Sequence, residues 1–285
     1  MPSRKARMIL LVVLIVVAVC FFGFIGISLT DGMFGDKIGV LEVSGVISES
    51  KDVMEDIVRF KEDDSIKGVI LRINSPGGSV GPSQEIFSEV KKLRTKKKVY
   101  VSMGSVCASG GYYIAVAGEK LYAMPATITG SIGVIMEHMI IEDLFKKLGL
   151  QSDTLKSGAF KDAGSPFRKM KNDERAYFQE ILDSIHDQFI KTVADERKLP
   201  LESARKLSDG RVFIGTQAKD LKLVDQIGTF YDAVDDLKKA LNMKGKPMLV
   251  YGKKPFSLLK WLISSASKEL VLEYFSRGPR YAVGP

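Results

Sequence analysis

The segment from Met8 to Thr30 contains no charged residue. Its apolar core of about 20 residues, coiled as a helix with a 1.5 Å rise per residue, spans the roughly 30 Å hydrocarbon layer of a bilayer. A cleavable signal peptide has a shorter apolar run of about 7–15 residues and a small-x-small exit, which Gly26-Ile27-Ser28 matches weakly. We expect one retained N-terminal transmembrane helix at 8–30; a cleaved signal, or lipoprotein processing at Cys20, is the alternative.

Basic residues on the N-terminal side orient this segment. Arg4, Lys5 and Arg7 lie within residues 1–7, and the positive-inside rule places them in the cytoplasm. Everything beyond the membrane helix then lies outside the cytoplasm, beginning with a short linker at 31–37. We therefore expect a single-pass protein of the cell (inner or plasma) membrane that contacts lipid through its N-terminal helix.

Composition and charge exclude several classes of protein. Of the 285 residues, 45% are hydrophobic and 27% are charged, which is ample material for a packed core and excludes intrinsic disorder. Two cysteines exclude a disulfide framework and a cysteine-based zinc module. The net charge of +8 lies in the N-terminal basic residues and in short runs such as 96–98, so we expect no nucleic-acid partner. Phosphate-loop, dinucleotide and H-E-x-x-H motifs are missing from the sequence, so we expect no cofactor and no metal.

Strand and helix patterns alternate along residues 38–245, which we expect to form one domain. Apolar runs of strand length lie at 38–43, 67–73, 99–103, 121–124 and 132–136. Helical spacing lies at 52–63, 82–93, 112–117, 142–148 and 172–197, the last with Asn172 as its cap. This alternation is typical of an α/β fold. Residues 246–285 form a tail with partly helical spacing, for which domain packing, a subunit contact and a membrane-surface contact all stay open.

Two glycine-rich turns follow strand patterns. In residues 74–79, successive glycines let N–H groups point into a cleft, where they could bind an oxyanion; an ordinary tight turn is the alternative. In residues 104–113, Ser109 stands between a strand and a helix, so it is either a helix cap or a nucleophile. The N–H groups of Gly78 and Gly110 would complete a two-donor oxyanion hole. Cys107 lacks a histidine placed to activate it, which favours a packing role.

A serine nucleophile needs a general base. His186 lies within a helical pattern, where a packing or surface role is expected, and nothing pairs His138 with a serine. Lys161 lies in a loop among small and apolar residues, and burial would favour its neutral form. Its neighbour Asp162 would keep it charged unless that carboxylate points away.

Four motifs give this arrangement a precedent: NSPGGS, MGSVCASGGYYIAVAG, ATITGSIGVI and LKSGAFKDAGSPFR, in that order. Together they resemble the signal peptide peptidase A family (peptidase family S49), membrane-anchored Ser/Lys-dyad proteases of the Clp-protease/crotonase fold superfamily with repeated β-β-α units. The resemblance covers roughly residues 38–245. It implies that Ser109 is the nucleophile and Lys161 the general base. It also implies that the N–H groups of Gly78 and Gly110 form the oxyanion hole. Ser131 would orient the lysine, and Gly77 would bind substrate.

The resemblance also implies a function. We expect a membrane serine endopeptidase that cleaves apolar peptides, chiefly remnant signal peptides left after pre-protein processing. One set of motifs indicates the short form, with a dyad supplied by one chain, and related enzymes imply a homo-oligomer. The alternatives are a protease that cuts stomatin-like membrane proteins, a catalytically silent membrane scaffold, and a crotonase-type acyl-CoA enzyme using the same N–H pair on a thioester enolate.

Overall fold

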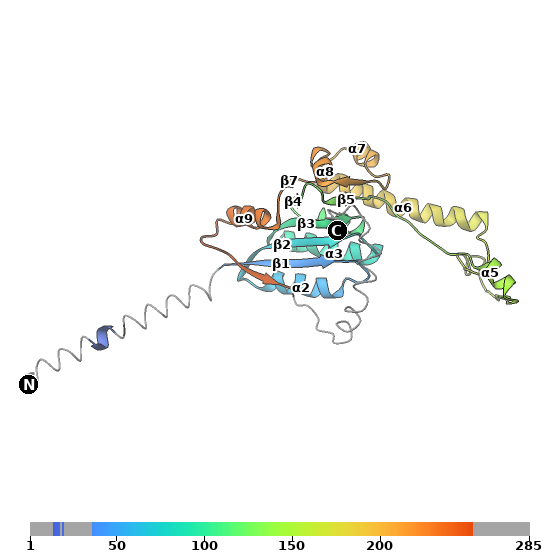
Figure 1. Ribbon diagram of the computed structural model, residues 1–285, viewed down its shortest axis with the longest axis horizontal. Helices are drawn as coiled ribbons and strands as arrows, with labels where there is room; N and C mark the ends of the chain where they lie inside the picture. Colours follow the sequence, from blue (N-terminus) through green and yellow to red (C-terminus); the bar gives the residue numbers. More distant parts are fainter. Residues whose placement is uncertain (1–13, 18, 20–35, 253–285) are drawn as a thin grey trace, which may run out of the picture. The chain divides into compact units, whose positions relative to one another are not determined.

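The computed structural model describes residues 14–17, 19 and 36–252 (Figure 1). The chain divides into two units, residues 1–251 and 252–285, and all elements below belong to the first. Most of the expected membrane segment 8–30, with Cys20, and most of the tail 246–285 lie outside the described residues. Within the described ranges no helix has both the length and the apolarity needed to cross a bilayer.

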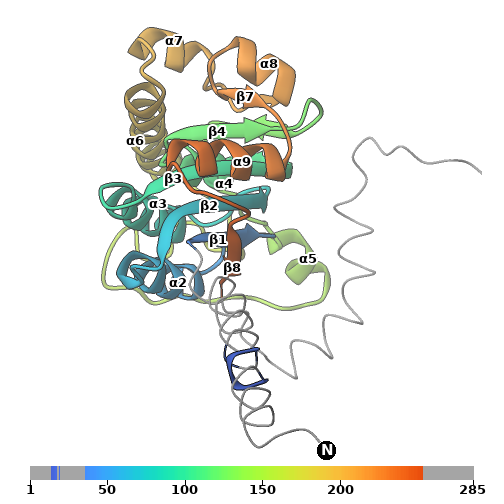
Figure 2. The same ribbon diagram turned by 90° about the vertical axis from the view of Figure 1, so that its left-hand side faces the viewer.

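A mixed sheet forms the centre of the first unit. Over the described residues its strands run in the order β6-β5-β3-β2-β1-β8, with β4 beside β3 and β7 beside β4 (Figures 1 and 2). Every neighbouring pair is parallel except β5 with β6. The strands are β1 (Lys37–Ser44), β2 (Ile66–Ser75), β3 (Lys98–Ala108), β4 (Lys120–Ala123), β5 (Ile128–Gly130), β6 (Val212–Ile214), β7 (Gln226–Ile227) and β8 (Met248–Tyr251).

Helices connect these strands and cover both faces of the sheet. They are α2 (Lys51–Glu62), α3 (Val80–Arg94), α4 (Gly110–Ala115), α5 (Glu142–Lys147), α6 (Asn172–Arg197), α7 (Leu201–Lys206), α8 (Gly215–Asp220) and α9 (Phe230–Ala240). Strands joined through helices in a mainly parallel sheet confirm the expected α/β class.

The apolar run of β2 explains why this strand lies inside the sheet. Val69, Leu71 and Ile73 are fully buried in a cluster with side chains of α2, α3 and α4. Ile70, pointing the other way, is fully buried in a second cluster with side chains of α9. Because successive side chains of a strand face opposite ways, a run without polar alternation requires cover on both faces. Figure 2 shows α9 lying across the strands on one of these faces.

Three details differ from the expectations. Residues 132–136 are not a strand: β5 ends at Gly130, where Gly130 and Ser131 take positive φ values of 77° and 50° and turn the chain. From β1 to α4 strands and helices alternate singly, so repeated β-β-α units do not describe this part of the chain. Asn172 is the first residue of α6, and Lys171 occupies the cap position. In addition, β8 pairs with β1 within the range expected as the tail.

Residues 136–171, which we call the arm, join the β5 region to α6. The arm carries α5 and extends away from the sheet (Figure 1). The rings of Phe145 and Phe167 pack edge to face at 4.9 Å, and the Ile141 N–H donates to the Pro166 carbonyl at 2.8 Å. The two ends of the arm therefore contact each other, and the chain between them forms a long loop.

Candidate active site

Three strands end together at one edge of the sheet. Ser75, the last residue of β2, pairs with Cys107 of β3, and Ala108, the last residue of β3, pairs with Gly130 of β5. All three strands are parallel, so their carboxyl ends share this edge. In open α/β sheets this is where ligands bind, because the loops beyond the strands surround a crevice.

Ser109 occupies a strained turn between β3 and α4. Its backbone has φ 51° and ψ −123°, a conformation that is costly for a residue with a side chain. The Ser109 N–H donates to the Gly130 carbonyl at 2.9 Å, and its own carbonyl accepts from the Tyr113 N–H at 2.9 Å. Although Ser109 is at the cap position, its side chain makes no capping hydrogen bond. A sharp strand-to-helix turn of this kind presents a serine hydroxyl to a cleft.

The two glycine turns are packed against each other beside Ser109. A Cβ placed on Gly77 would lie 2.7 Å from the Gly110 nitrogen and 2.8 Å from the Ser109 Cβ. A Cβ on Gly110 would lie 3.3 Å from the Gly78 nitrogen. As the first residue of α4, Gly110 has an N–H without an intrahelical acceptor. Both amides therefore lie next to the serine, with no side chain of their own in the way.

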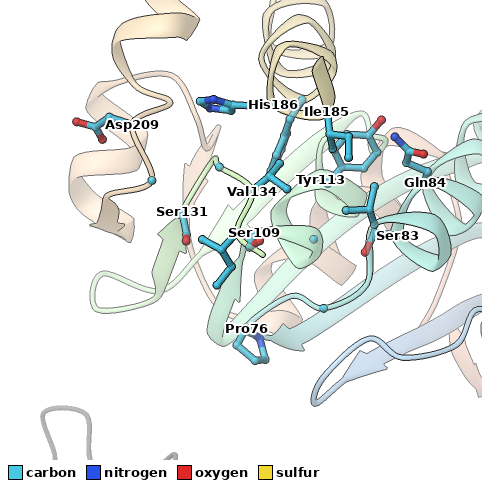
Figure 3. A pocket seen from close by; sticks show the side chains of 17 residues that line it. Pro76, Ser83, Gln84, Ser109, Tyr113, Ser131, Val134, Ile185, His186 and Asp209 are labelled. Carbon is cyan, nitrogen blue, oxygen red and sulfur yellow. The ribbon is translucent and has the colours of Figure 1, made fainter. Parts of the chain in front are cut away.

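A cavity of about 470 Å³ opens over this turn (Figure 3). Four of the six residues singled out in the sequence line it: Gly78, Ser109, Gly110 and Ser131. Gly77 does not line it and instead packs behind Ser109. The apolar part of the wall is provided by Val80, Tyr113, Val134, Ile135, Ile185 and Phe189.

Val134 and Ile135 explain the wrong strand prediction. Both lie in the segment 132–136, which has no regular structure and forms one wall of the cavity. A short apolar run is equally suited to a buried strand and to the wall of an apolar pocket. Ser131 directly precedes this segment, and its N–H donates to the Arg211 carbonyl at 2.9 Å.

Lys161 is not brought to the cavity of its own chain. The cavity has no lysine among its lining residues, and the Lys161 side chain is exposed on a turn of the arm. The neighbouring Asp162 accepts hydrogen bonds from Lys156 and from Arg168, at 2.7 Å from the Arg168 Nε. These cations, Arg168 first, hold the pKa of the Asp162 carboxyl below its usual range.

His186, for which a packing or surface role was expected, lines the cavity. It lies on α6, and its Nε2 is buried without a hydrogen-bond partner among the described residues. Its position one turn before the buried residues Phe189 and Ile190 was the available signal. Asp209 also lines the cavity, and the hydrogen bond from Arg211 lowers the pKa of Asp209 to about 2. His138 does not line the cavity.

Cys107 is part of the core, as its packing role requires. The side chain is completely buried, and this burial raises the pKa of the thiol far above its ordinary value. A thiol that stays protonated at neutral pH is a poor nucleophile. The expectation that Cys107 packs rather than reacts agrees with this placement.

Comparison with known proteins identifies the family of this chain. The family model described as "Peptidase family S49" matches residues 91–244. The "Putative signal peptide peptidase SppA" of Enterococcus faecium is 36% identical over 238 residues, covering 79% of this chain and 69% of that protein. Protease 4 of Haemophilus influenzae is 36% identical over 221 residues, covering 73% of this chain but 35% of its own length.

A solved structure gives a weaker likeness. A ClpP1 mutant from Listeria monocytogenes aligns with a TM-score of 0.48 at 19% identity, over 68% of this chain and 94% of that chain. A TM-score of this size does not by itself establish a common fold. The expected Clp-protease/crotonase-like architecture therefore stays a prediction beyond the α/β class.

Proposed function

The chain belongs to peptidase family S49 and is a serine protease, and from this premise we propose that Ser109 is its nucleophile and Lys161 its general base. The observation that carries the assignment of Ser109 is its strained turn: the hydroxyl is not used for capping, it lines the cavity, and the amides of Gly78 and Gly110 lie beside it. The proposed nucleophile and the proposed oxyanion donors are therefore neighbours in the cavity wall, which supports the assignment.

In the proposed reaction the Ser109 Oγ attacks the carbonyl carbon of the scissile peptide bond. The neutral Lys161 amine takes the hydroxyl proton, and the N–H groups of Gly78 and Gly110 stabilise the resulting oxyanion. The tetrahedral intermediate collapses when its C–N bond breaks and Lys161 returns the proton to the leaving amine. Water then attacks the acyl-serine by the same route and restores the Ser109 hydroxyl. Ser131 would hydrogen-bond the lysine; Gly77 lies behind Ser109 rather than in the cavity wall, so we assign it no contact with the peptide.

We further propose a homo-oligomer in which the arm of a neighbouring copy supplies Lys161. This replaces the expectation of a dyad supplied by one chain, because Lys161 does not line the cavity of its own chain. The arm exposes large apolar side chains that a monomer would leave in water, namely Met139 (75% exposed), Leu144 (55%), Leu148 (63%) and Leu155 (94%). Several large apolar side chains exposed on one segment favour an interface with another copy.

The substrate class follows from the cavity wall. Val80, Tyr113, Val134, Ile185 and Phe189 give it an apolar lining, which favours peptides with apolar side chains. Together with the membrane anchor that we expect at 8–30 and the extracytoplasmic catalytic domain that it implies, this lining supports remnant signal peptides as substrates. A protease of stomatin-like membrane proteins is the alternative that fits the same lining. Membership of a peptidase family disfavours the silent scaffold and the acyl-CoA enzyme.

Hydrolysis of a fluorogenic apolar peptide by the full chain in mild detergent tests the proposal. We expect activity in the wild type and its loss in both Ser109→Ala and Lys161→Ala, with unchanged oligomeric state in each. Activity that survives in Ser109→Ala would refute the nucleophile. If Lys161→Ala alone stays active, the base is wrong, and His186 is the next residue to replace because it lines the cavity.

A further inference from the structure

The carboxylate next to the proposed base is held by other cations. Asp162 follows Lys161 directly in the chain, yet its side chain is 13% exposed while that of Lys161 is turned to solvent. One carboxylate oxygen of Asp162 accepts from the Arg168 Nε at 2.7 Å, and the other accepts from the Lys156 ammonium. Both oxygens are therefore engaged by cations other than Lys161.

Arg168 is itself fixed from the far side by a buried glutamate. Its two terminal nitrogens donate to the two carboxylate oxygens of Glu174 at 2.8 and 2.6 Å, and one of them also donates to the Asp162 carbonyl at 3.1 Å. The Glu174 side chain is 2% exposed and lies in the first turn of α6. A planar guanidinium bound in this two-pronged way has one preferred orientation. Arg168 therefore presents its Nε to Asp162 from a fixed position.

Resting on the proposed role of Lys161, we infer that Arg168 is a positioning residue that withholds the Asp162 carboxylate from Lys161. The groups paired at this turn are Lys156, Asp162 and Arg168 on the arm and Glu174 on α6. Lys171, at the end of the arm, also faces Glu174 and donates its backbone N–H to that carboxylate at 2.9 Å. Two cations and two anions satisfy one another, and Lys161 forms no ion pair within the described part of the chain.

The consequence concerns the proton that Lys161 must accept. A carboxylate within about 4–6 Å of a lysine favours the ammonium form and raises the lysine pKa by about 1–3 units. A general base has to be unprotonated when substrate binds, so such a pairing would remove most of its activity near neutral pH. Arg168 prevents this pairing while leaving Asp162 in place to shape the turn.

The pH dependence of kcat/KM in the full-length oligomer tests the inference. In Arg168→Met the Asp162 oxygen that Arg168 held becomes free to pair with Lys161, while Lys156 keeps the other oxygen. We expect the acid limb of the profile to move up by about one pH unit, which is about a tenfold loss of rate at a pH on that limb. Removing the carboxylate as well, in Arg168→Met/Asp162→Asn, should return the limb to its wild-type position. Asp162→Asn alone should keep the wild-type limb. Arg175→Met, at an exposed position of α6 without an ion pair among the described residues, is the matched control.

The outcomes separate this inference from the proposed function. If Lys161→Ala is inactive but Arg168→Met lowers the rate without moving the acid limb, or if Asp162→Asn does not rescue it, Arg168 has only a structural role and the inference is wrong. If Lys161→Ala is as active as the wild type, the proposed base fails first, whatever the behaviour of Arg168.

Discussion

Replacing Gly78 by alanine tests the proposed oxyanion site at a position where the backbone leaves no room for a Cβ atom. A Cβ at this position would lie 2.2 Å from the carbonyl oxygen of Ile47 and 2.6 Å from the Ile47 nitrogen. Both are backbone atoms, so the turn itself has to move by about 1 Å to reach an ordinary contact distance. A misplacement of about 1 Å costs about 100-fold in rate, and loss of one oxyanion donor costs about 100- to 1,000-fold. We therefore expect kcat/KM to fall by about 100- to 1,000-fold.

The assay is peptide hydrolysis by the full chain, with thermal unfolding followed by circular dichroism on the same samples. Crowding at Gly78 should also lower the free energy of unfolding by about 1–3 kcal/mol. Gly81→Ala is the matched control, because a Cβ there meets no atom within 4 Å and lies in the first turn of α3. It should keep both the rate and the stability. A folded Gly78→Ala protein with wild-type kcat/KM would refute the role given to the Gly78 amide.

Three further predictions concern burial and charge. Because Cys107 is completely buried and its thiol pKa is raised, alkylation by iodoacetamide should reach it only on unfolding; mass spectrometry showing modified Cys107 in the active protein would contradict this. Leu237→Ala, which empties a fully buried site between α9 and the sheet, should cost about 2–5 kcal/mol in chemical denaturation, and a loss well below that range would mean that α9 contributes little to the core. Hydrogen bonding by Arg168 lowers the pKa of the Glu174 carboxyl to about 2, so the ionised carboxylate stabilises the fold above its unfolded pKa of about 4.5 and this contribution is lost as the pH falls toward 2. Between pH 4.5 and 2 the Tm should therefore drop more steeply in the wild type than in Glu174→Gln. Parallel Tm curves would show that the Arg168–Glu174 pair does not contribute to stability.

The sequence alone predicts which edge of the sheet carries Ser109. Apolar runs ending in small residues and glycines mark where buried parallel strands leave a sheet, and parallel strands leave it at one edge. The loops at 74–79 and 104–113 therefore had to meet, and the structure places Gly77, Gly78 and Gly110 against one another. Glycines mark both turns in the sequence, and the parallel strands bring the two turns to the same edge of the sheet. The sequence pattern therefore predicts their contact correctly.

An apolar pattern does not show whether its residues form a strand, pack in a core or line a cavity. In the apolar run 132–136, Val134 and Ile135 line the cavity and Ile132 is buried in the core, and none of the three lies in a strand; spacing does not distinguish these cases. His186 was assigned a packing or surface role because a helical pattern shows which face is buried but not whether that face meets a core or a cavity. The position of Lys161 depends on how the arm folds and, in the proposed oligomer, on the neighbouring copy that it meets, and no local pattern specifies either.

The ion-pair partners of Asp162 could not be predicted from the sequence either. The sequence raised the question of whether Asp162 points away from Lys161, and the structure answers it through Arg168, six residues later, and Lys156, six residues earlier. Several cations in this stretch lie at comparable sequence distance, so only the turns of the arm decide which of them reach the carboxylate.

Mixing two inactive variants tests the central claim most directly. Ser109→Ala and Lys161→Ala are co-produced with different affinity tags, and oligomers that carry both tags are isolated and assayed on the fluorogenic peptide. If each site joins Ser109 of one copy to Lys161 of the next, about one quarter of the sites in a random mixture are intact, because half of the serines and half of the lysines are intact. The isolated oligomers that carry both tags should therefore show at least about one quarter of the wild-type activity. Mixed oligomers that stay as inactive as the two parents would contradict a dyad shared between copies of this chain.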